Sequence, residues 1–594
     1  MPTLLYGRTC DCNLSENVMA DSVENEIISL RSQKKRLGSF YTPFPLAEKI
    51  ANESLNSWLN KHSHFDRENL LECVQNLKIL DPSCGDGVFL IVAANWLYRT
   101  LQELGDSTPE IELQKSILSN SLFGVDVDFD AVNDCREVLL QWHSPNQSVS
   151  EQTEEVVKTN IRQGNSLTTF DWINEFPFIT KREKPGFDII LGNPPYGNIL
   201  SKKARETIQT SYPYSVGGNR TGTWNSAAHF IVKSSTLLRE GGELGFLIPN
   251  SILRVKQFTK TRQFLLNHLN LWKIIDEGSP FEGVTLEMVT VFCRKSNSKY
   301  LDDVEVESRR PEHKQKNVMK REILRDSNII SIYHDDIFEK ILSRGRKGFL
   351  TATRGRDIPK AYVRKEVSKE FPIPYITSGR SVRRYHIDKN YQIFTNDWYL
   401  INKGMKESYS NAWLVATKNY RYPRCVIKPK GIINGGGIVR IMPTENNIDL
   451  KTLGLILNSR LIQYICTRYL TNYSQLTTCL NTGILEELPI VYPAHPKGFA
   501  LLFDRLSTLY ENVHIPERNS CIDTIEEFSD ALVYELYLMK EQELGEELSK
   551  INTDSKTQSI DIQLLCKQLQ ANSIASRIDK IAKLPIVKQI KSRL

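Results

Sequence analysis

The chain has 594 residues, which at about 150 residues per domain is too long for one hydrophobic core, so we expect two to four domains. Hydrophobic residues make up 40% and charged residues 25%, which is usual for a globular protein and excludes a collagen, a coiled-coil rod and a mainly disordered chain. The net charge of +6 says little about partners, and eleven cysteines without a Cys-x-x-Cys pair argue against a zinc site and a disulfide framework.

The first half of the chain is predicted to alternate between strand and helix. Residues 1–37 are polar, end in a basic cluster and are expected to form a loosely held leader. From 78 to 294, short apolar runs alternate with helical stretches, which is typical of a parallel α/β sheet with helices on both faces. The predicted strands are 78–80, 122–127, 187–191, 243–248, 272–275 and 288–293, and the predicted helices are 46–59, 88–104, 130–142 and 224–238.

Three further segments follow a first domain at 38–296. Residues 297–348 begin with a strongly charged stretch and are predicted to be a linker or exposed arm. Residues 349–492 mix short strands with glycine loops and are predicted to form a second, mixed α/β domain. Residues 493–594 are helical in character.

The charge is concentrated in one of these segments. Residues 341–440 contain 21 Lys/Arg and 6 Asp/Glu, a net charge of +15, so the rest of the chain carries −9. The segment is also rich in aromatic residues, and such a composition suits contacts to phosphates and bases. A solvated basic face over an ordinary core is the alternative interpretation.

A glycine-rich turn follows the first predicted strand, with the sequence Asp81-Pro82-Ser83-Cys84-Gly85-Asp86-Gly87. A strand, a glycine turn and a helix bring the backbone close to a ligand at the carboxyl edge of a sheet. The turn lacks the lysine and Ser/Thr of a phosphate-binding loop, so ATP is not expected. The next predicted strand carries Asp126 near its end, where an acidic residue can bind both hydroxyls of a ribose. Together these features indicate a nucleoside cofactor.

A second motif, Asn193-Pro194-Pro195-Tyr196, follows the strand predicted at 187–191. Two consecutive prolines end the strand and fix the backbone, so the Asn193 amide and a backbone carbonyl can face outward as rigid acceptors. A planar amino group is a poor nucleophile because its lone pair feeds into the ring. Two acceptors that hold its hydrogens can localise that lone pair, and Tyr196 can stack on the base. A proline-rich turn that merely caps a buried strand is the alternative.

In sequence order these motifs resemble the γ-class amino-methyltransferases of the TaqI-like type, which methylate N6 of adenine in DNA. The resemblance covers 38–295 and rests on GSFYTP (38–43), DPSCGDGVFL (81–90), FGVDVD (123–128), GNSL (164–167), NPPY (193–196) and EGVT (282–285), preceded by Phe281. More loosely, 349–492 resembles the target-recognition domain of this family, through SGRSVRRY (378–385) and LNSR (457–460).

The resemblance implies a class I (Rossmann-like) methyltransferase sheet, a mixed α/β target-recognition domain and a helical C-terminal segment. It implies an adenine-specific DNA methyltransferase, the modification component of a restriction-modification or related defence system, with S-adenosylmethionine as cofactor and double-stranded DNA as substrate. The implied catalytic residues are Asn193, Pro194, Pro195, Tyr196 and Phe281, with Tyr196 and Phe281 sandwiching a flipped-out adenine.

The same resemblance implies further site residues. Those for the cofactor are Tyr41, Thr42, Asp81, Pro82, Cys84, Gly85, Gly87, Asp126, Asn165 and Asn193. Asn165 stands where the family usually has an acidic residue, so it would accept the amino hydrogen of the cofactor's adenine without a charge. Candidate DNA contacts are Arg354, Arg356, Arg380, Arg383 and Arg384, since arginine is a common reader of guanine edges and binder of phosphates. No metal is expected.

Several alternatives stay open at this point. Enzymes with NPPY also methylate RNA bases and protein glutamine, although these are mostly compact. A fused nuclease would need a carboxylate set, for which Asp303 with Glu312-His313-Lys314 is a weak candidate in the charged stretch. A non-catalytic DNA-binding module is a third alternative. The C-terminal segment could brace the recognition domain or dock a separate restriction endonuclease subunit, and the oligomeric state is undetermined.

The compartment follows from what the sequence lacks. No apolar run approaches the roughly 20 residues of a membrane span, and the N-terminus has no signal-peptide pattern. We therefore expect a cytoplasmic protein of a bacterial or archaeal cell, with reduced thiols and no membrane contact.

Overall fold

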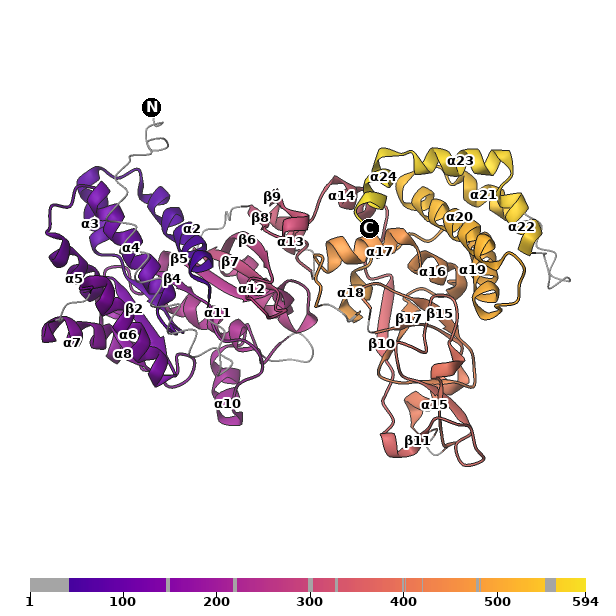
Figure 1. The fold of residues 1–594 in the computed structure, drawn as a ribbon, viewed down its shortest axis with the longest axis horizontal. Helices are drawn as coiled ribbons and strands as arrows, with labels where there is room; N and C mark the ends of the chain where they lie inside the picture. The colour runs from indigo at the N-terminus through magenta and orange to yellow at the C-terminus, as the bar shows by residue number, and fades with distance from the viewer. Residues whose placement is uncertain are drawn as a thin grey trace. The chain divides into compact units, whose positions relative to one another are not determined.

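The computed structural model describes residues 42–145, 150–216, 222–296, 303–325, 329–397, 400, 402–418, 420–476, 480, 482–550 and 562–594. The predicted leader at 1–37 lies outside these residues. The chain divides into two compact units, Met1–Asp326 and Ser327–Leu594 (Figure 1). No helix in the described ranges is both long and apolar enough to cross a membrane.

The first unit is built on a sheet whose nine described strands have the order β3-β2-β1-β4-β5-β7-β6-β8-β9. Strands β3 to β5 are parallel, and β7 is antiparallel to both β5 and β6. The strands are β1 (Ile79–Asp81), β2 (Leu122–Asp126), β3 (Ile161–Gln163), β4 (Phe187–Gly192), β5 (Leu238–Pro249), β6 (Asn270–Gly278), β7 (Met288–Arg294), β8 (Val304–Ser308) and β9 (Gln315–Met319). All six predicted strands are present, whereas the short, polar β3 was not predicted.

Helices cover both faces of this sheet. Leu122 points into the main hydrophobic cluster, which contains buried residues of α2, α4 and α6, and Phe123 points to the other face, where it packs against Phe176 and Phe178. The helices are α2 (Phe44–His62), α3 (Arg67–Gln75), α4 (Val88–Glu103), α5 (Glu110–Asn120), α6 (Phe129–His143), α7 (Glu151–Asn160), α8 (Trp172–Glu175), α9 (Phe178–Lys181), α10 (Lys202–Ser211), α11 (Ser226–Leu237), α12 (Thr259–Asn267) and α13 (Arg321–Arg325). The four predicted helices correspond to α2, α4, α6 and α11.

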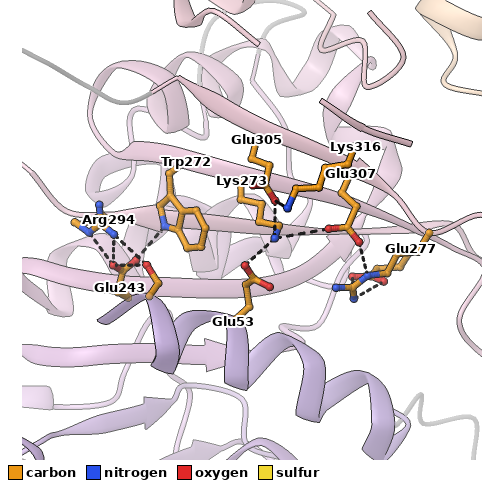
Figure 2. A network of polar contacts seen from close by, with 11 residues as sticks. Glu53, Glu243, Trp272, Lys273, Glu277, Arg294, Glu305, Glu307 and Lys316 are labelled. Carbon is orange, nitrogen blue, oxygen red and sulfur yellow. Dashed lines mark hydrogen bonds and ion pairs between the residues drawn. The ribbon is translucent and has the colours of Figure 1, made fainter. Parts of the chain in front are cut away.

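The prediction of a linker at 297–348 is wrong for most of its described residues. Strands β8 and β9 form a hairpin that extends the sheet, with β8 parallel to β6. Side chains of β8 alternate between buried and half-buried, as in an ordinary strand. Its two glutamates, Glu305 and Glu307, are not solvated linker residues, because both form ion pairs with the buried Lys273 of β6 (Figure 2).

The second unit combines two small sheets with a set of helices. The sheet β10-β17-β14-β15 contains β10 (Leu350–Arg354), β17 (Ile438–Pro443), β14 (Trp413–Thr417) and β15 (Cys425–Lys428). The sheet β11-β13-β12-β16 contains β11 (Val363–Arg364), β13 (Ile393–Thr395), β12 (Ile373–Ile376) and β16 (Ile433–Asn434). This mixture of short strands and loops agrees with the segment character predicted for 349–492.

Helices of the second unit pack directly on its strands. Helix α16 (Leu450–Leu457) contacts both β15 and α19 (Pro496–Glu511), so the predicted domains 349–492 and 493–594 lie in one compact unit. The other helices are α14 (Asp336–Leu342), α15 (Lys403–Ser410), α17 (Arg460–Tyr464), α18 (Thr482–Glu487), α20 (Arg518–Leu538), α21 (Glu543–Lys550), α22 (Ile562–Leu569), α23 (Asn572–Ala582) and α24 (Pro585–Ser592). Helix α14 falls in the predicted linker but is tied to this unit, because Asp335, which caps it, pairs with Arg468.

Candidate active site

A cavity of about 650 Å³ lies in the first unit, where β1, β2 and β4 end. Strands β1 and β4 are parallel neighbours from which the strand order runs in opposite directions, and open α/β sheets bind ligands at such a switch point. Ten predicted site residues line the cavity: Thr42, Asp81, Pro82, Cys84, Gly85, Asp126, Asn165, Asn193, Pro195 and Tyr196. Gly87, Pro194 and Phe281 are not part of its lining, and Tyr41 lies outside the described residues.

The turn after β1 is locked to the end of β2. The backbone N–H of Gly85 donates to Asp126 Oδ2 over 3.0 Å, and the N–H of Asp128 donates to Asp126 Oδ1 over 2.9 Å. Gly87, the residue before α4, has a φ of +84°, and a Cβ there would lie 2.8 Å from Cys135 Sγ. Only glycine combines that backbone conformation with so close an approach. The Asp126 carboxylate is therefore held in one orientation beside the cavity.

Two acidic groups of the cavity, Asp81 and Asp126, are shielded from solvent. Asp81 is 1% exposed, its Oδ1 accepts from the Ser83 N–H over 3.0 Å, and burial raises the pKa of this carboxyl to about 8. Burial also raises the pKa of Asp126, although the backbone N–H groups of Asp128 and Gly85 oppose the shift. A cationic ligand would relieve both desolvated carboxyls, because a nearby opposite charge favours the ionised form.

Cys84 lines the cavity but is not a reactive thiol. It is 3% exposed, and both its neighbour Cys135 and burial raise the pKa of the Cys84 thiol. Since the thiolate is the nucleophile of cysteine chemistry, this environment makes Cys84 inert. Its role is that of a small residue in the turn after β1.

Asn165 occupies the predicted position but uses its side-chain oxygen locally. Its Oδ1 accepts from the backbone N–H groups of Leu167 at 3.1 Å and Thr168 at 3.2 Å. A carbonyl oxygen has two lone pairs, and both are engaged here. The atom predicted to accept from the cofactor's adenine therefore caps the turn after β3 instead.

Asn193 and Tyr196 carry polar atoms without partners. Asn193 Oδ1 and the Tyr196 hydroxyl are buried, and neither has a hydrogen-bond partner among the described residues. Burial also raises the pKa of Tyr196 to about 12. Buried polar atoms in proteins are almost always hydrogen-bonded, so an exception in a cavity indicates a ligand that supplies the partner.

The loop that carries these residues is held by the start of α11. The Ser226 hydroxyl donates to the Pro195 carbonyl over 2.5 Å, and the Ser226 N–H donates to the Gly197 carbonyl over 3.0 Å. Sequence reasoning did not single out Ser226. The signal that could have found it is Asn225, whose side chain caps the helix and so places Ser226 in its first turn.

The prediction for Phe281 needs correction. Its side chain is 7% exposed and lies in the main hydrophobic cluster, against which Tyr196 packs. An aromatic ring stacks on a base only where it borders the cavity, and Phe281 does not. Burial of its ring in the core stabilises the fold and leaves Tyr196 as the aromatic residue at the motif.

The candidate DNA contacts divide into two groups. Arg354, Arg356 and Arg380 are exposed, and Arg383 is half-buried, 4.0 Å from Asp388. Arg384 is wrongly predicted, because its guanidinium pairs with Glu526 of α20 at 3.3 Å and lies 5.3 Å from the centre of the Tyr385 ring. This pair joins residues 378–385 to α20, so the Arg384 guanidinium is already engaged within the protein.

The structure also places the nuclease candidate, Asp303 with Glu312-His313-Lys314, beside a strand rather than in a linker. Asp303 precedes β8, and Glu312 lies in the turn beyond the other end of that strand, so the two residues flank a strand of the sheet. At about 3.3 Å per residue, however, the five residues of β8 separate the two carboxylates by roughly 16 Å. No group of three or more potential metal ligands occurs among the residues that the structure describes.

The strand order, the glycine turn after β1 and the NPPY loop after β4 define the class I (Rossmann-like) methyltransferase fold. Residues 120–281 match the family model "Eco57I restriction-modification methylase", so the chain carries a methylase domain of the restriction-modification type. This range contains β2, the NPPY loop and Phe281.

Known proteins of this type are similar over larger parts of the chain. The type II restriction enzyme and methyltransferase RM.Eco57I of Escherichia coli is 26% identical over 49% of this chain and 31% of its own. The type II methyltransferase M.VspI of Vibrio sp. (strain 343) is 24% identical over 44% of this chain and 49% of its own. The chain thus spans less than half the length of each.

The fold likeness extends over both units. The Type IIL restriction-modification enzyme MmeI, solved in complex with DNA, aligns with 94% of this chain and 79% of its own at a TM-score of 0.53 and 12% identity. At that identity the likeness concerns the fold alone. It includes the second unit, which the family model does not reach.

Proposed function

We propose that this protein is the methyltransferase of a restriction-modification system and transfers a methyl group from S-adenosylmethionine to N6 of adenine in double-stranded DNA. The observation that carries this proposal is the buried, unpartnered Oδ1 of Asn193 in a cavity that also contains the oriented carboxylate of Asp126. The exocyclic amino group of a base supplies the donor that this oxygen lacks. The restriction-modification relatives support DNA as the substrate, and the resemblance of the motifs, in their order along the chain, to those of the γ-class enzymes supports adenine N6.

The residues around the cavity fit a nucleoside that bears a positive charge. Asp126 would hold the ribose hydroxyls, and the glycine turn brings backbone N–H groups close to the ligand. Asp81, Asp86 and Asp128 add to the acidic character of the lining, which suits a sulfonium. The volume of about 650 Å³ lies within the range of about 300–1,000 Å³ that is usual for such ligands. S-adenosylmethionine, when bound, supplies an electrophilic methyl group.

The catalytic work of the chain is positioning and polarisation. The target adenine leaves the duplex, since its amino group cannot be reached in the stack. Asn193 Oδ1, in the cavity lining, accepts one N6 hydrogen, and the carbonyl of Pro194, which follows in the same loop although it is not part of the lining, accepts the other. Together they localise the lone pair on N6. Tyr196 stacks on the ring, without Phe281 on the other side. A rigid loop held by Ser226 keeps these acceptors in place, so little reorganisation is needed during the reaction.

The second unit is proposed to read the DNA sequence. Its exposed Arg354, Arg356 and Arg380, together with Arg383, would contact phosphates and base edges. Loss of a phosphate contact weakens binding to all sequences and lowers the salt dependence, whereas loss of a base contact relaxes specificity at one position.

Methylation-aware long-read sequencing of DNA from cells that express the protein tests the proposal. Wild-type protein should produce N6-methyladenine at one sequence motif, and Asn193→Ala should abolish it. Asn76→Ala, an exposed asparagine that follows α3, is the matched control and should leave methylation unchanged.

Two results would contradict the proposal. Equal methylation by wild type and Asn193→Ala would exclude the assigned role of Asn193. Transfer of a labelled methyl group to RNA or protein, with none to DNA, would exclude DNA as the substrate. Methyl transfer at this site would then be the only part of the proposal that remains.

A further inference from the structure

The loop that follows the NPPY motif carries an exposed apolar residue at the cavity. Ile199 is 63% exposed and lines the cavity, with Leu200 and Ser201 beside it. A single exposed isoleucine on a protein surface needs no explanation. Ile199 differs because it lies at the mouth of the site, three residues after Tyr196, on the side of the catalytic loop rather than the glycine turn.

One arginine holds this loop on both sides of Ile199. Arg205 Nε donates to the Leu200 carbonyl over 3.2 Å, and Arg205 Nη2 donates to Asn198 Oδ1 over 3.0 Å. Its guanidinium also lies 5.5 Å from the ring centre of Trp224. The residues on either side of Ile199 are thus fixed by the same group, which keeps the isoleucine presented outward.

Two lysines follow this loop directly in the sequence. Lys202 and Lys203 are exposed and occupy the first two positions of α10, a helix that projects from the first unit (Figure 1). Cations at a helix N-terminus oppose the helix dipole, so local helix stability does not account for them. An anionic partner at the mouth of the cavity would account for the two lysines, and DNA phosphates have the complementary charge.

We propose that Ile199 is an apolar wedge that holds the target nucleotide out of the duplex, while Lys202 and Lys203 contact phosphates of the same strand. The inference rests on the proposed function and deepens it. Apolar side chains, isoleucine among them, insert between base steps and partly unstack them. The wedge acts before the methyl transfer, and Ile199 is therefore a positioning residue, not a catalytic one.

The test compares Ile199→Ala with Ile111→Ala, an isoleucine of α5 that is 60% exposed and is not part of the cavity lining. Single-turnover methylation is measured on two duplexes that carry the recognition sequence found by methylation-aware sequencing. One is fully paired, and the other has an abasic site opposite the target adenine, which lowers the cost of flipping. Affinity for S-adenosylmethionine is measured by calorimetry.

We expect Ile199→Ala to lower the rate on the paired duplex about tenfold or more and to approach the wild-type rate on the abasic duplex, because base flipping costs a few kcal/mol. Cofactor affinity should change far less than the rate on the paired duplex, and Ile111→Ala should match wild type on both duplexes. The double substitution Lys202→Ala and Lys203→Ala should reduce the slope of log affinity against log salt concentration by about 2.

Two outcomes would overturn the wedge. An equal loss of rate on both duplexes, or no loss on either, would show that Ile199 does not act through base flipping while leaving the proposed function intact. A wild-type protein that methylates neither duplex would contradict the proposed function itself, and the wedge with it.

Discussion

Gly192, the last residue of β4, lies directly against Asp81, the last residue of β1. A Cβ at position 192 would be 2.7 Å from Asp81 Oδ1, and the φ of Gly192 is +153°. The residue before the NPPY motif therefore touches the first residue of the glycine-turn motif. This contact sets the spacing between the two halves of the candidate active site.

Replacing Gly192 should disturb both halves at once. In Gly192→Ala, the added methyl group must displace the Asp81 carboxylate or the NPPY loop, so methylation should fall at least tenfold and the free energy of unfolding by about 1–3 kcal/mol. Methylation assays and chemical denaturation measure these effects. Gly348→Ala is the control, since its φ is also positive, at +69°, but nothing lies within 4 Å of the added atom. If both variants behave alike, backbone strain rather than the Asp81 contact is responsible.

The raised pKa of Asp81 predicts a pH dependence of stability. Burial raises the pKa of this carboxyl from 3.8 to about 8, so between these values the folded state retains a proton that the unfolded chain releases. The free energy of unfolding without ligand should therefore fall as the pH rises through this window and level off above it, with a slope of up to about 1.4 kcal/mol per pH unit. Denaturation at several pH values should show a smaller slope for Asp81→Asn. An unchanged slope in that variant, or a flat profile for the wild type, would contradict the prediction.

A buried lysine should stabilise the hairpin β8–β9 on the sheet. Lys273 is 4% exposed, and its Nζ lies 2.7 Å from carboxylate oxygens of both Glu53 and Glu305 (Figure 2). In Lys273→Met these carboxylates lose their counter-charge, and the free energy of unfolding should fall by about 2–4 kcal/mol; a fully buried pair would cost more. Chemical denaturation measures the loss. Lys316→Met should cost less than about 1 kcal/mol, because Lys316 is 63% exposed although it also pairs with Glu305.

Arg384 should contribute to stability and not to DNA binding. Its pair with Glu526 links 378–385 to α20, and Arg384→Ala should lower the free energy of unfolding by about 1–3 kcal/mol without changing the salt dependence of DNA affinity. The exposed Arg380 is the matched comparison, since Arg380→Ala should weaken DNA binding with little effect on stability. Fluorescence anisotropy and denaturation separate the two roles. A loss of DNA affinity in folded Arg384→Ala would reinstate Arg384 as a contact.

Much of the candidate active site could be predicted from the sequence alone, because its signals are local. The apolar runs before Asp81 and Asn193 identify β1 and β4, and the turns that follow have side chains suited to only a few chemistries. The order of these motifs along the chain then fixes which of them meet at the carboxyl edge of a parallel sheet. Ten of the predicted residues accordingly line one cavity.

Only the tertiary structure decided where charged and aromatic residues find their partners. Glu305 looked like part of a solvated linker because its counter-charge, Lys273, lies on another strand, and Lys273 itself pairs with Glu53, 220 residues away. Arg384 looked free because Glu526 lies 142 residues further on. The burial of Phe281 likewise depends on packing among distant elements, and packing of this kind leaves no local pattern in the sequence.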